Sequence, residues 1–269
     1  MPVSKLKNLA ILILLLANIV LLCLLVPRQA ERRKQEQQLR SSLSSLCAGQ
    51  NVALQADVLP DTVTLYELEL ADTHSAEDNA LAAVLGEAPN REEGQLQSGQ
   101  ELRSGSWEDG RLFLKLQAQK PVSDLRGASK KTLRKMDFQY HSLGQPVRLS
   151  PGIYSITAQQ SVLGMPIFSD GLTFTYSNSA LSELQGTFFA GSLTRTDNTP
   201  CISAAQAVVA FLSARVELGW VGSTVTGLEQ GYVPSVASGT VRLTPAWMLS
   251  TDTGSYLVDG LTQQVSIVE

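Results

Sequence analysis

Asp252-Thr253-Gly254 is the stretch whose residue types come nearest to a catalytic motif. Aspartic proteases use this triplet, and their chemistry needs two carboxylates that share one proton. A second Asp-Thr-Gly is absent from the 269 residues, so a protease of this kind would need a dimer. The triplet also lies between two strand patterns, where Asp and Gly favour a tight turn. We therefore expect a turn, and replacing Asp252 by Asn is a simple test for an anchored hydrolase.

Other residues that could do chemistry are few. His74 and His141 are the two histidines, and neither has a cysteine or acidic cluster at metal-ligand spacing. Ser4 and Lys7 match the spacing of a Ser-x-x-Lys nucleophile, but they lie on a short tail before an apolar segment. The sequence contains no Gly-x-Ser-x-Gly elbow and no Gly-rich phosphate loop. We expect no enzyme activity, no cofactor, no metal site and no small-molecule substrate.

Two features could instead serve binding. Trp247, two residues after Pro245, could form a binding platform with Tyr256 of the next strand, although a cross-strand pair that fills a core is the more common use. A basic face formed by Lys130, Lys131, Arg134 and Lys135 is expected on a helix. Such a face is more often solvated than occupied by an anionic partner.

The net charge limits the classes of partner, and the cysteine content limits the possible disulfide bonds. A formal net charge of −4 and a pI near 5.3 give no basic field, which argues against nucleic acid as a partner. Cys23 lies in the apolar segment, which leaves Cys47 and Cys201. Either these two form a disulfide or they are two separate thiols, and their spacing gives no support for the disulfide.

The element that determines where any such site would lie is the apolar run Leu9–Val26. Eighteen residues of helix span about 27 Å, close to the ~30 Å of a bilayer core. Lys5 and Lys7 precede the run, no Ala-x-Ala cleavage site follows it, and Leu22 stands where a lipoprotein signal needs a small residue. These features predict an uncleaved signal anchor.

The orientation of the anchor and its contacts are open from the residues alone. Five basic residues follow the run between positions 28 and 40 and two precede it, so the positive-inside rule by itself would place the bulk in the cytoplasm. Asn18 offers an amide at mid-membrane, and Ala10 and Ala17 would let another helix approach closely. These three residues are the candidates for contact with a partner helix; the alternative is one tolerated amide in a leucine-rich span.

Five segments follow from the patterns along the chain. They are an N-terminal tail (1–7), a transmembrane anchor (8–26), a juxtamembrane helical stalk (27–50), a first α+β module (51–147) and a second α+β module (148–269). In the first module we expect a strand near residues 63–70, a helix between a Ser75/Asp78 capping box and Gly86, a loop at 89–100 and a hairpin at Asp109-Gly110.

The second module has the clearer signals. Strands are expected over 154–160, 172–176 and 181–188, and a meander over 243–268. Ser203 and Gln206 form a capping box, and the helix after it should bury Val208, Phe211, Leu212 and Val216. The fold class is therefore α+β, with two antiparallel-sheet-plus-helix modules after a single transmembrane helix.

The order of several segments resembles a known family. One part reads Gln-Gln and then Gly-x-Pro-Ile/Val-Phe; the closing part reads Gly-Tyr, Leu-x-Pro-x-Trp and Tyr-x-Val-Asp. The segments are Gln159–Phe168, Leu172–Tyr176, Ile202–Leu218, Gly231-Tyr232, Leu243–Trp247 and Tyr256–Thr262. They resemble the YycI regulatory proteins of low-GC Gram-positive bacteria, with closing hairpins like those of YycH and PepSY-like modules. Gly260 replaces the usual Ala, and Gln263-Gln264 stands where Thr-Gly would end the pattern.

The resemblance is specific over about the last 110 residues and architectural before them. It implies a single-pass protein of the cell membrane with a cytoplasmic N-terminus and an extracytoplasmic bulk. It also implies partners: a YycH-like protein and the sensor histidine kinase WalK (YycG), whose signalling governs cell-wall metabolism. The family offers no catalytic residue to transfer to this chain.

Two functional hypotheses follow for this sequence. The first is a non-enzymatic regulator of a sensor histidine kinase that acts through transmembrane-helix and extracytoplasmic contacts. The second is a PepSY-like binding module that docks a protease or a cell-wall ligand and uses the anchor only as a tether.

Overall fold

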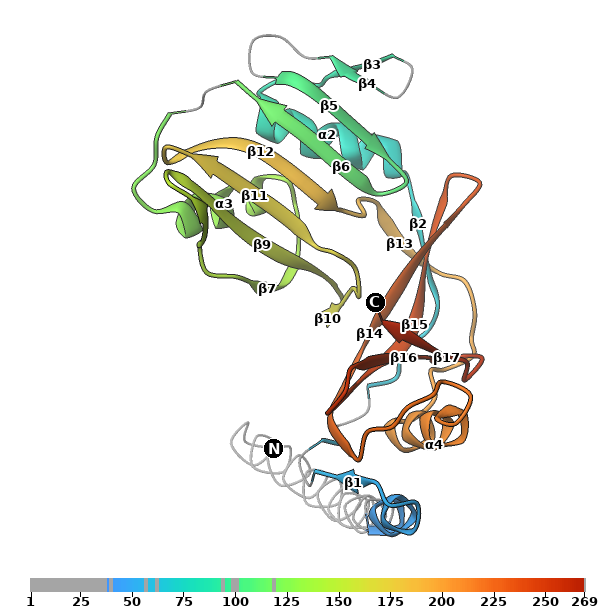
Figure 1. Cartoon of the computed structure of the whole chain (residues 1–269). Coiled ribbons are helices and arrows are strands. Elements are labelled where there is room, and N and C mark those ends of the chain that lie inside the picture. Colours follow the sequence, from blue (N-terminus) through green and yellow to red (C-terminus); the bar gives the residue numbers. More distant parts are fainter. Residues whose placement is uncertain are drawn as a thin grey trace, which may run out of the picture.

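A computed structural model of the chain describes residue 38 and residues 41–55, 58–60, 63–92, 95–97, 102–117 and 120–268. Within this part the chain forms two antiparallel-rich sheets with helices packed on them (Figure 1), which confirms the α+β class. The predicted anchor, with Ala10, Ala17 and Asn18, lies outside the described residues. Within the described part, no helix is long and apolar enough to cross a membrane.

The larger sheet has ten strands and occupies the upper half of Figure 1. Its strands pair in the order β10-β9-β11-β12-β6-β5-β4-β3, and β7 and β8 pair with the outer side of β9. The strands are β3 Asn90–Glu92, β4 Gln95–Gln97, β5 Leu102–Glu108, β6 Arg111–Leu116, β7 Tyr140–Leu143, β8 Val147–Ser150, β9 Ile153–Val162, β10 Met165–Pro166, β11 Leu172–Ser177 and β12 Ala180–Thr187.

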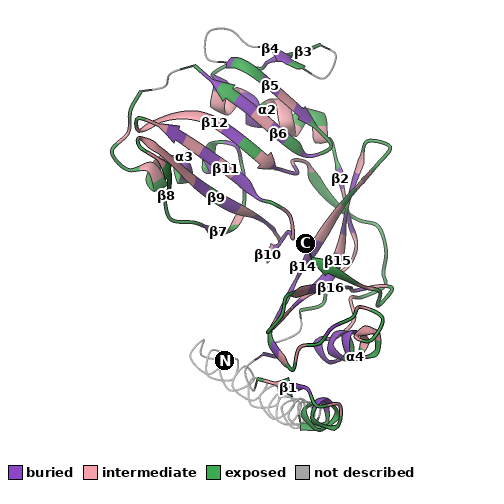
Figure 2. Ribbon diagram, in the orientation of Figure 1, coloured by how far each residue is buried: buried purple, intermediate pink, exposed green. Residues whose placement is uncertain are grey.

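Two helices, α2 (Thr73–Leu85) and α3 (Leu125–Lys135), cover one face of this sheet. Buried and more exposed residues alternate along β6, β9 and β11 (Figure 2), as expected of an antiparallel sheet with one solvated face. The core includes Leu114, Leu184 and Phe174, all with no exposed surface. Asp124 caps α3 by accepting from Gly127 N at 2.9 Å.

The smaller sheet has seven strands. They are β1 Ala53–Leu54, β2 Leu68–Ala71, β13 Ser192–Arg195, β14 Thr224–Ala237, β15 Thr240–Thr251, β16 Ser255–Asp259 and β17 Val265–Val268. The predicted meander over 243–268 is confirmed as β15-β16-β17, and β14, which was not predicted, extends it on the other side of β15. Strand β2 lies between β15 and β13. Helix α4 (Ala204–Ala214) and the helical segment 41–49 share a core with this sheet around Phe211 and Trp247.

The two sheets touch at the short segment just after β10. Ile167 forms a parallel bridge with Tyr232 of β14, and Phe168 N donates to Tyr232 O at 2.8 Å. A separate apolar cluster, with Leu70, Ile167 and Tyr232 among its members, fills the space beneath this contact. The two sheets therefore meet through packed side chains as well as through backbone.

Several local expectations differ from the structure. The ten-stranded sheet runs across the boundary expected between residues 147 and 148, because β12 of the later segment pairs with β6 of the earlier one. Helix α2 begins at Thr73 after Asp72, whose side chain makes no cap, so the Ser75/Asp78 capping box is wrong. The expected loop 89–100 contains the short strands β3 and β4.

The Ser203 and Gln206 capping box is confirmed, with both reciprocal contacts present. The helix that it begins is shorter than expected. Val216 lies beyond the last residue of α4 and is 80% exposed, so its predicted burial is wrong. A side chain in the turn after a helix no longer follows the helical periodicity that would direct it to the core.

Candidate functional site

The Asp-Thr-Gly triplet forms a turn between β15 and β16, as predicted. Asp252 Oδ2 accepts from Ser223 N at 2.9 Å and from Ser223 Oγ at 3.1 Å. Hydrogen bonding by the Ser223 amide holds the pKa of this carboxyl below its ordinary value. Thr253 Oγ1 accepts from Trp220 Nε1 at 2.8 Å. The triplet therefore ties a turn to the segment before β14.

The two histidines lie apart. His74 is exposed, with Nδ1 3.8 Å from Glu77 Oε2, whereas His141 Nε2 lies 3.2 Å from Glu229 Oε1 across the two sheets. A search of the described residues finds no group of three or more His, Cys, Asp or Glu side chains that could hold a metal ion.

Trp247 belongs to the core and forms no exposed platform. It has no exposed surface, and its indole Nε1 donates to Ile202 O at 2.9 Å. Its cross-strand neighbour is Val258, while Tyr256 pairs with Leu249 and packs its ring 4.9 Å from that of Phe211. Trp247 thus fixes the start of α4 on the sheet.

The two cysteines of the described part are free thiols. Cys47 is buried and Cys201 is half-buried, and both contribute to the core under α4. Burial raises the pKa of each thiol. Of the two alternatives open from the sequence, the structure has separate thiols.

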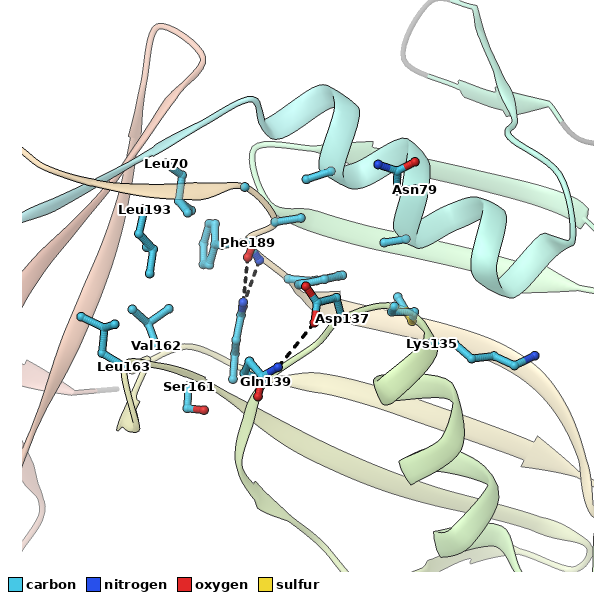
Figure 3. A pocket seen from close by; sticks show the side chains of 17 residues that line it. Leu70, Asn79, Lys135, Asp137, Gln139, Ser161, Val162, Leu163, Phe189 and Leu193 are labelled. Carbon is cyan, nitrogen blue, oxygen red and sulfur yellow. Dashed lines mark hydrogen bonds between the residues drawn. The ribbon is translucent and has the colours of Figure 1, made fainter.

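A pocket of about 470 Å³ lies where the two sheets and α2 meet (Figure 3), and we call it the junction pocket. Its walls come from α2, the end of α3, the β9–β10 hairpin and the link between β12 and β13. They include Leu70, Ala76, Asn79, Ala80, Lys135, Met136, Asp137, Gln139, Gln160, Ser161, Val162, Leu163, Phe188, Phe189, Ala190, Gly191 and Leu193.

Gln160 holds one wall of the junction pocket in place. Its buried side chain donates from Nε2 to Phe189 O at 2.7 Å and accepts at Oε1 from Phe189 N at 2.9 Å. The amide therefore pairs with residue 189 as a neighbouring strand would. Since backbone groups in the interior need partners, this contact lets the link after β12 pass through a buried position without a strand beside it.

The rim of the junction pocket is apolar. Leu163 is 67% exposed and Leu193 is 40% exposed. In Figure 3, Leu193 of β13 and Leu163 and Val162 of the β9–β10 hairpin point toward one another. Leu163 also has φ +53°, a left-handed conformation that bulky residues rarely adopt. Exposed apolar side chains and unusual backbone both occur more often at functional sites.

The polar part of the junction pocket lies on the opposite side. Asp137 follows α3 with φ +55° and accepts weakly from Gln139 Nε2 at 3.4 Å, and Asn79 of α2 also lines the pocket. The amine of Lys135 extends away from the centre in Figure 3. Among the described residues that line the pocket, none is a histidine or cysteine. This arrangement can bind a group that is partly apolar and partly able to form hydrogen bonds.

No pattern in the sequence predicts this site. Gln159-Gln160 stands out only through the family resemblance, and the turn at Leu163-Gly164 carries no standard turn signature that would identify it. The exposed leucines come from segments about 30 residues apart, and Leu70 comes from a third segment. Only the folded arrangement brings them together.

Comparison with known proteins gives little on function. No protein-family model and no curated protein matches the chain. An uncharacterized protein from Eubacterium rectale ATCC 33656 matches with a TM-score of 0.49 and 8% identity, over 81% of this chain and 90% of that one. The YpeB C-terminal domain of Bacillus megaterium matches with a TM-score of 0.34 and 13% identity, over 74% of this chain and 99% of that domain. At TM-scores below 0.5, neither likeness defines the fold family or the function.

Proposed function

We propose that this chain is a non-catalytic regulator, anchored in the cell membrane by residues 8–26, whose extracytoplasmic body binds a partner at the junction pocket. The observation that carries the proposal is the pocket itself. It pairs an exposed leucine rim with a polar side and offers no nucleophile next to a base among its described lining residues. Such a site can hold a partner and has no evident means to transform it.

The proposed setting is the regulation of a sensor histidine kinase together with a YycH-like protein. This setting is supported by the resemblance of the closing segments to YycI proteins. A PepSY-like fold for the extracytoplasmic body is part of the same proposal. Several residues of the resembling segments have structural roles near the junction. Gln160 clamps Phe189, Phe168 bonds Tyr232, and Gly231 leaves room for the Phe168 ring.

Contact between membrane helices is the second part of the proposed mechanism. Asn18, with Ala10 and Ala17, remains the candidate surface, and all three lie outside the described residues. Replacing Leu9–Val26 by an unrelated membrane span tests this part. If the chimera regulates normally, the helix-contact mechanism is wrong, while binding at the junction pocket is untouched.

The pocket part is tested by kinase output in cells. Leu163→Glu places a charge on the rim, and Leu149→Glu places the same charge at a similarly exposed position on β8. We expect Leu163→Glu to shift a kinase-dependent transcriptional reporter as far as deletion of the whole gene does, at unchanged protein level. Leu149→Glu should behave as wild type. Equal effects of the two variants would contradict the proposal.

A PepSY-like module that docks a protease or a wall fragment is the alternative. The neutral polar groups of Asn79, Gln139 and Ser161 favour it, because they can pair with amides or hydroxyls of such a ligand. A soluble fragment should begin near residue 38, since Leu43 and Cys47 belong to the core. Binding of a protease or wall fragment by residues 38–268, without the kinase, would favour this alternative.

A further inference from the structure

Strand β13 has a free edge beside the junction pocket. It pairs with β2 on one side, and the pairings among the described residues place no strand on its other side. All four of its residues are exposed. A strand with a free edge presents unpaired N–H and C=O groups to any extended chain that approaches it.

The alternation of hydrogen bonds between β13 and β2 determines which backbone N–H and C=O groups of β13 are free. Thr196 N donates to Glu67 O at 3.2 Å just beyond the strand, and the register pairs Thr194 with Glu69. In an antiparallel ladder, successive residues face alternately toward and away from the neighbour. Thr194 therefore faces β2, whereas the N–H and C=O of Leu193 and Arg195 face outward.

The side chains at this edge continue an apolar row that ends at the pocket. Val241 of β15 pairs with Leu70 of β2, and Leu70 pairs with Leu193. Residues directly opposite one another in a sheet project to the same face. A residue placed opposite Leu193 on an added strand would therefore project over the junction pocket, toward Leu163.

The usual protection of such an edge is weak here. Natural edge strands are often shielded by an outward charge, and Arg195 is the one charged residue of β13. Its guanidinium lies 3.2 Å from the ring centre of Tyr66, and its Nε donates to Asp197 O at 2.8 Å. The positive charge of Arg195 is thus held by contacts within the chain and does not project outward to shield the edge.

We propose that the junction pocket binds an extended peptide segment of a partner protein, which adds to β13 as a further strand and inserts an apolar side chain opposite Leu193. This deepens the proposed function and rests on it. The occupant is an extended backbone because the free groups recur every second residue along the edge. The side-chain preference follows from the leucine rim, and such strand addition is a recurrent mode of peptide recognition.

Hydrogen exchange gives the most specific test. The full chain in detergent micelles is used to select binders from a displayed library of random nine-residue peptides. A selected peptide should slow exchange at the Leu193 and Arg195 amides and leave Thr194 and Thr196 unchanged, because their amides already bond to β2. Slowing at all four amides, or at none, would overturn the proposal.

Matched variants test the same contact by affinity. Leu193→Pro deletes an outward N–H together with the side chain, and Leu193→Ala deletes the side chain alone. We expect Leu193→Pro to weaken peptide binding at least about tenfold and Leu193→Ala to weaken it less. Leu149→Pro is the control, since Leu149 is exposed and lies at a register shift of β8. An equal loss with Leu149→Pro would reject the inference.

Two other outcomes are informative. If Leu193→Pro fails to fold, the hydrogen-exchange pattern of the wild-type chain with bound peptide is by itself the test of strand addition. Peptides that depend on Leu163 but do not slow exchange at Leu193 would reject strand addition and leave the proposed function standing. If sedimentation shows a dimer whose Leu193 and Arg195 amides are protected without peptide, the edge belongs to a second copy and the proposal is wrong.

Discussion

Replacing Gln160 by leucine should lower the free energy of unfolding by about 3 kcal/mol. The side chain is 4% exposed and satisfies both backbone groups of Phe189, at 2.7 and 2.9 Å. An unsatisfied buried backbone group costs about 1–3 kcal/mol, so two cost about 2–6 kcal/mol. The extra apolar surface of leucine offsets part of that loss. Since natural domains are stable by about 5–15 kcal/mol, the change is large.

The assay is urea unfolding of the 38–268 fragment followed by tryptophan fluorescence. The control is Gln159→Leu, because Gln159 is the neighbouring residue and takes part only in a weak 3.4 Å contact from Ser142 Oγ. We expect the control to change stability by about 0.5 kcal/mol or less. If both variants lose the same amount, the reasoning about the Phe189 clamp is wrong.

Gln160→Glu adds a pH dependence of defined sign. The carboxylate keeps an acceptor for Phe189 N but faces Phe189 O with a second oxygen, so burial and this repulsion raise its folded pKa above the ordinary glutamate value. Stability should be fully present below that ordinary value, where the protonated acid donates to Phe189 O. It should be lost as the pH rises through the raised pKa. A variant with no such dependence would contradict the buried contact.

Three further predictions concern the closing strands. Gly260→Ala should cost about 1–3 kcal/mol in urea unfolding, because a Cβ would lie 2.5 Å from Pro245 O; no loss would show that the turn can shift. Hydrogen bonding from Ser223 lowers the pKa of the Asp252 carboxyl. The stability that this contact contributes is therefore present above the ordinary aspartate pKa and is lost as the pH falls through the lowered pKa. Asp252→Asn should abolish this pH dependence of the unfolding free energy. Burial raises the pKa of the Tyr232 hydroxyl to about 12. The contribution of the neutral side chain to folding stability is therefore lost as the pH rises from about 10 toward 12. Tyr232→Phe should remove an ultraviolet titration step in this pH range.

Local signals in the sequence were sufficient for much of the fold. Asp109-Gly110 forms the hairpin turn between β5 and β6, because both residues adopt positive φ there. Ser203 and Gln206 begin α4 with a complete capping box. Each of these features depends on residues within a few positions of one another, so the pattern alone carries the information.

Features that depend on distant residues could not be predicted in the same way. The pairing of β6 with β12 joins segments about 70 residues apart, and nothing in the alternation of either strand identifies its partner. Gln160 and Gln230 look like surface glutamines, yet each side chain pairs with both backbone groups of one distant residue, Phe189 and Val63. Buried polar side chains of this kind are evident only when the neighbouring backbone is known.

The departure at Gly260 from the resembling pattern also has a physical reason. A Cβ at this position would approach the Cys201 thiol and the Pro245 carbonyl oxygen, and Gly260 N donates to that same oxygen at 2.8 Å. Alanine would therefore need a different side chain at position 201 or a different turn. From sequence alone, the change could be judged only as a tolerated turn substitution.

The most direct measurement of partner binding at the junction pocket is site-specific photo-crosslinking in living cells. A photoreactive side chain is introduced at Leu163 of the full chain, with Leu149 as the control position because its exposure is similar. We predict that position 163 crosslinks to the sensor histidine kinase or the YycH-like protein and that position 149 does not. No crosslink from position 163 to either protein, or equal crosslinking from both positions, would contradict a regulator that acts through this pocket.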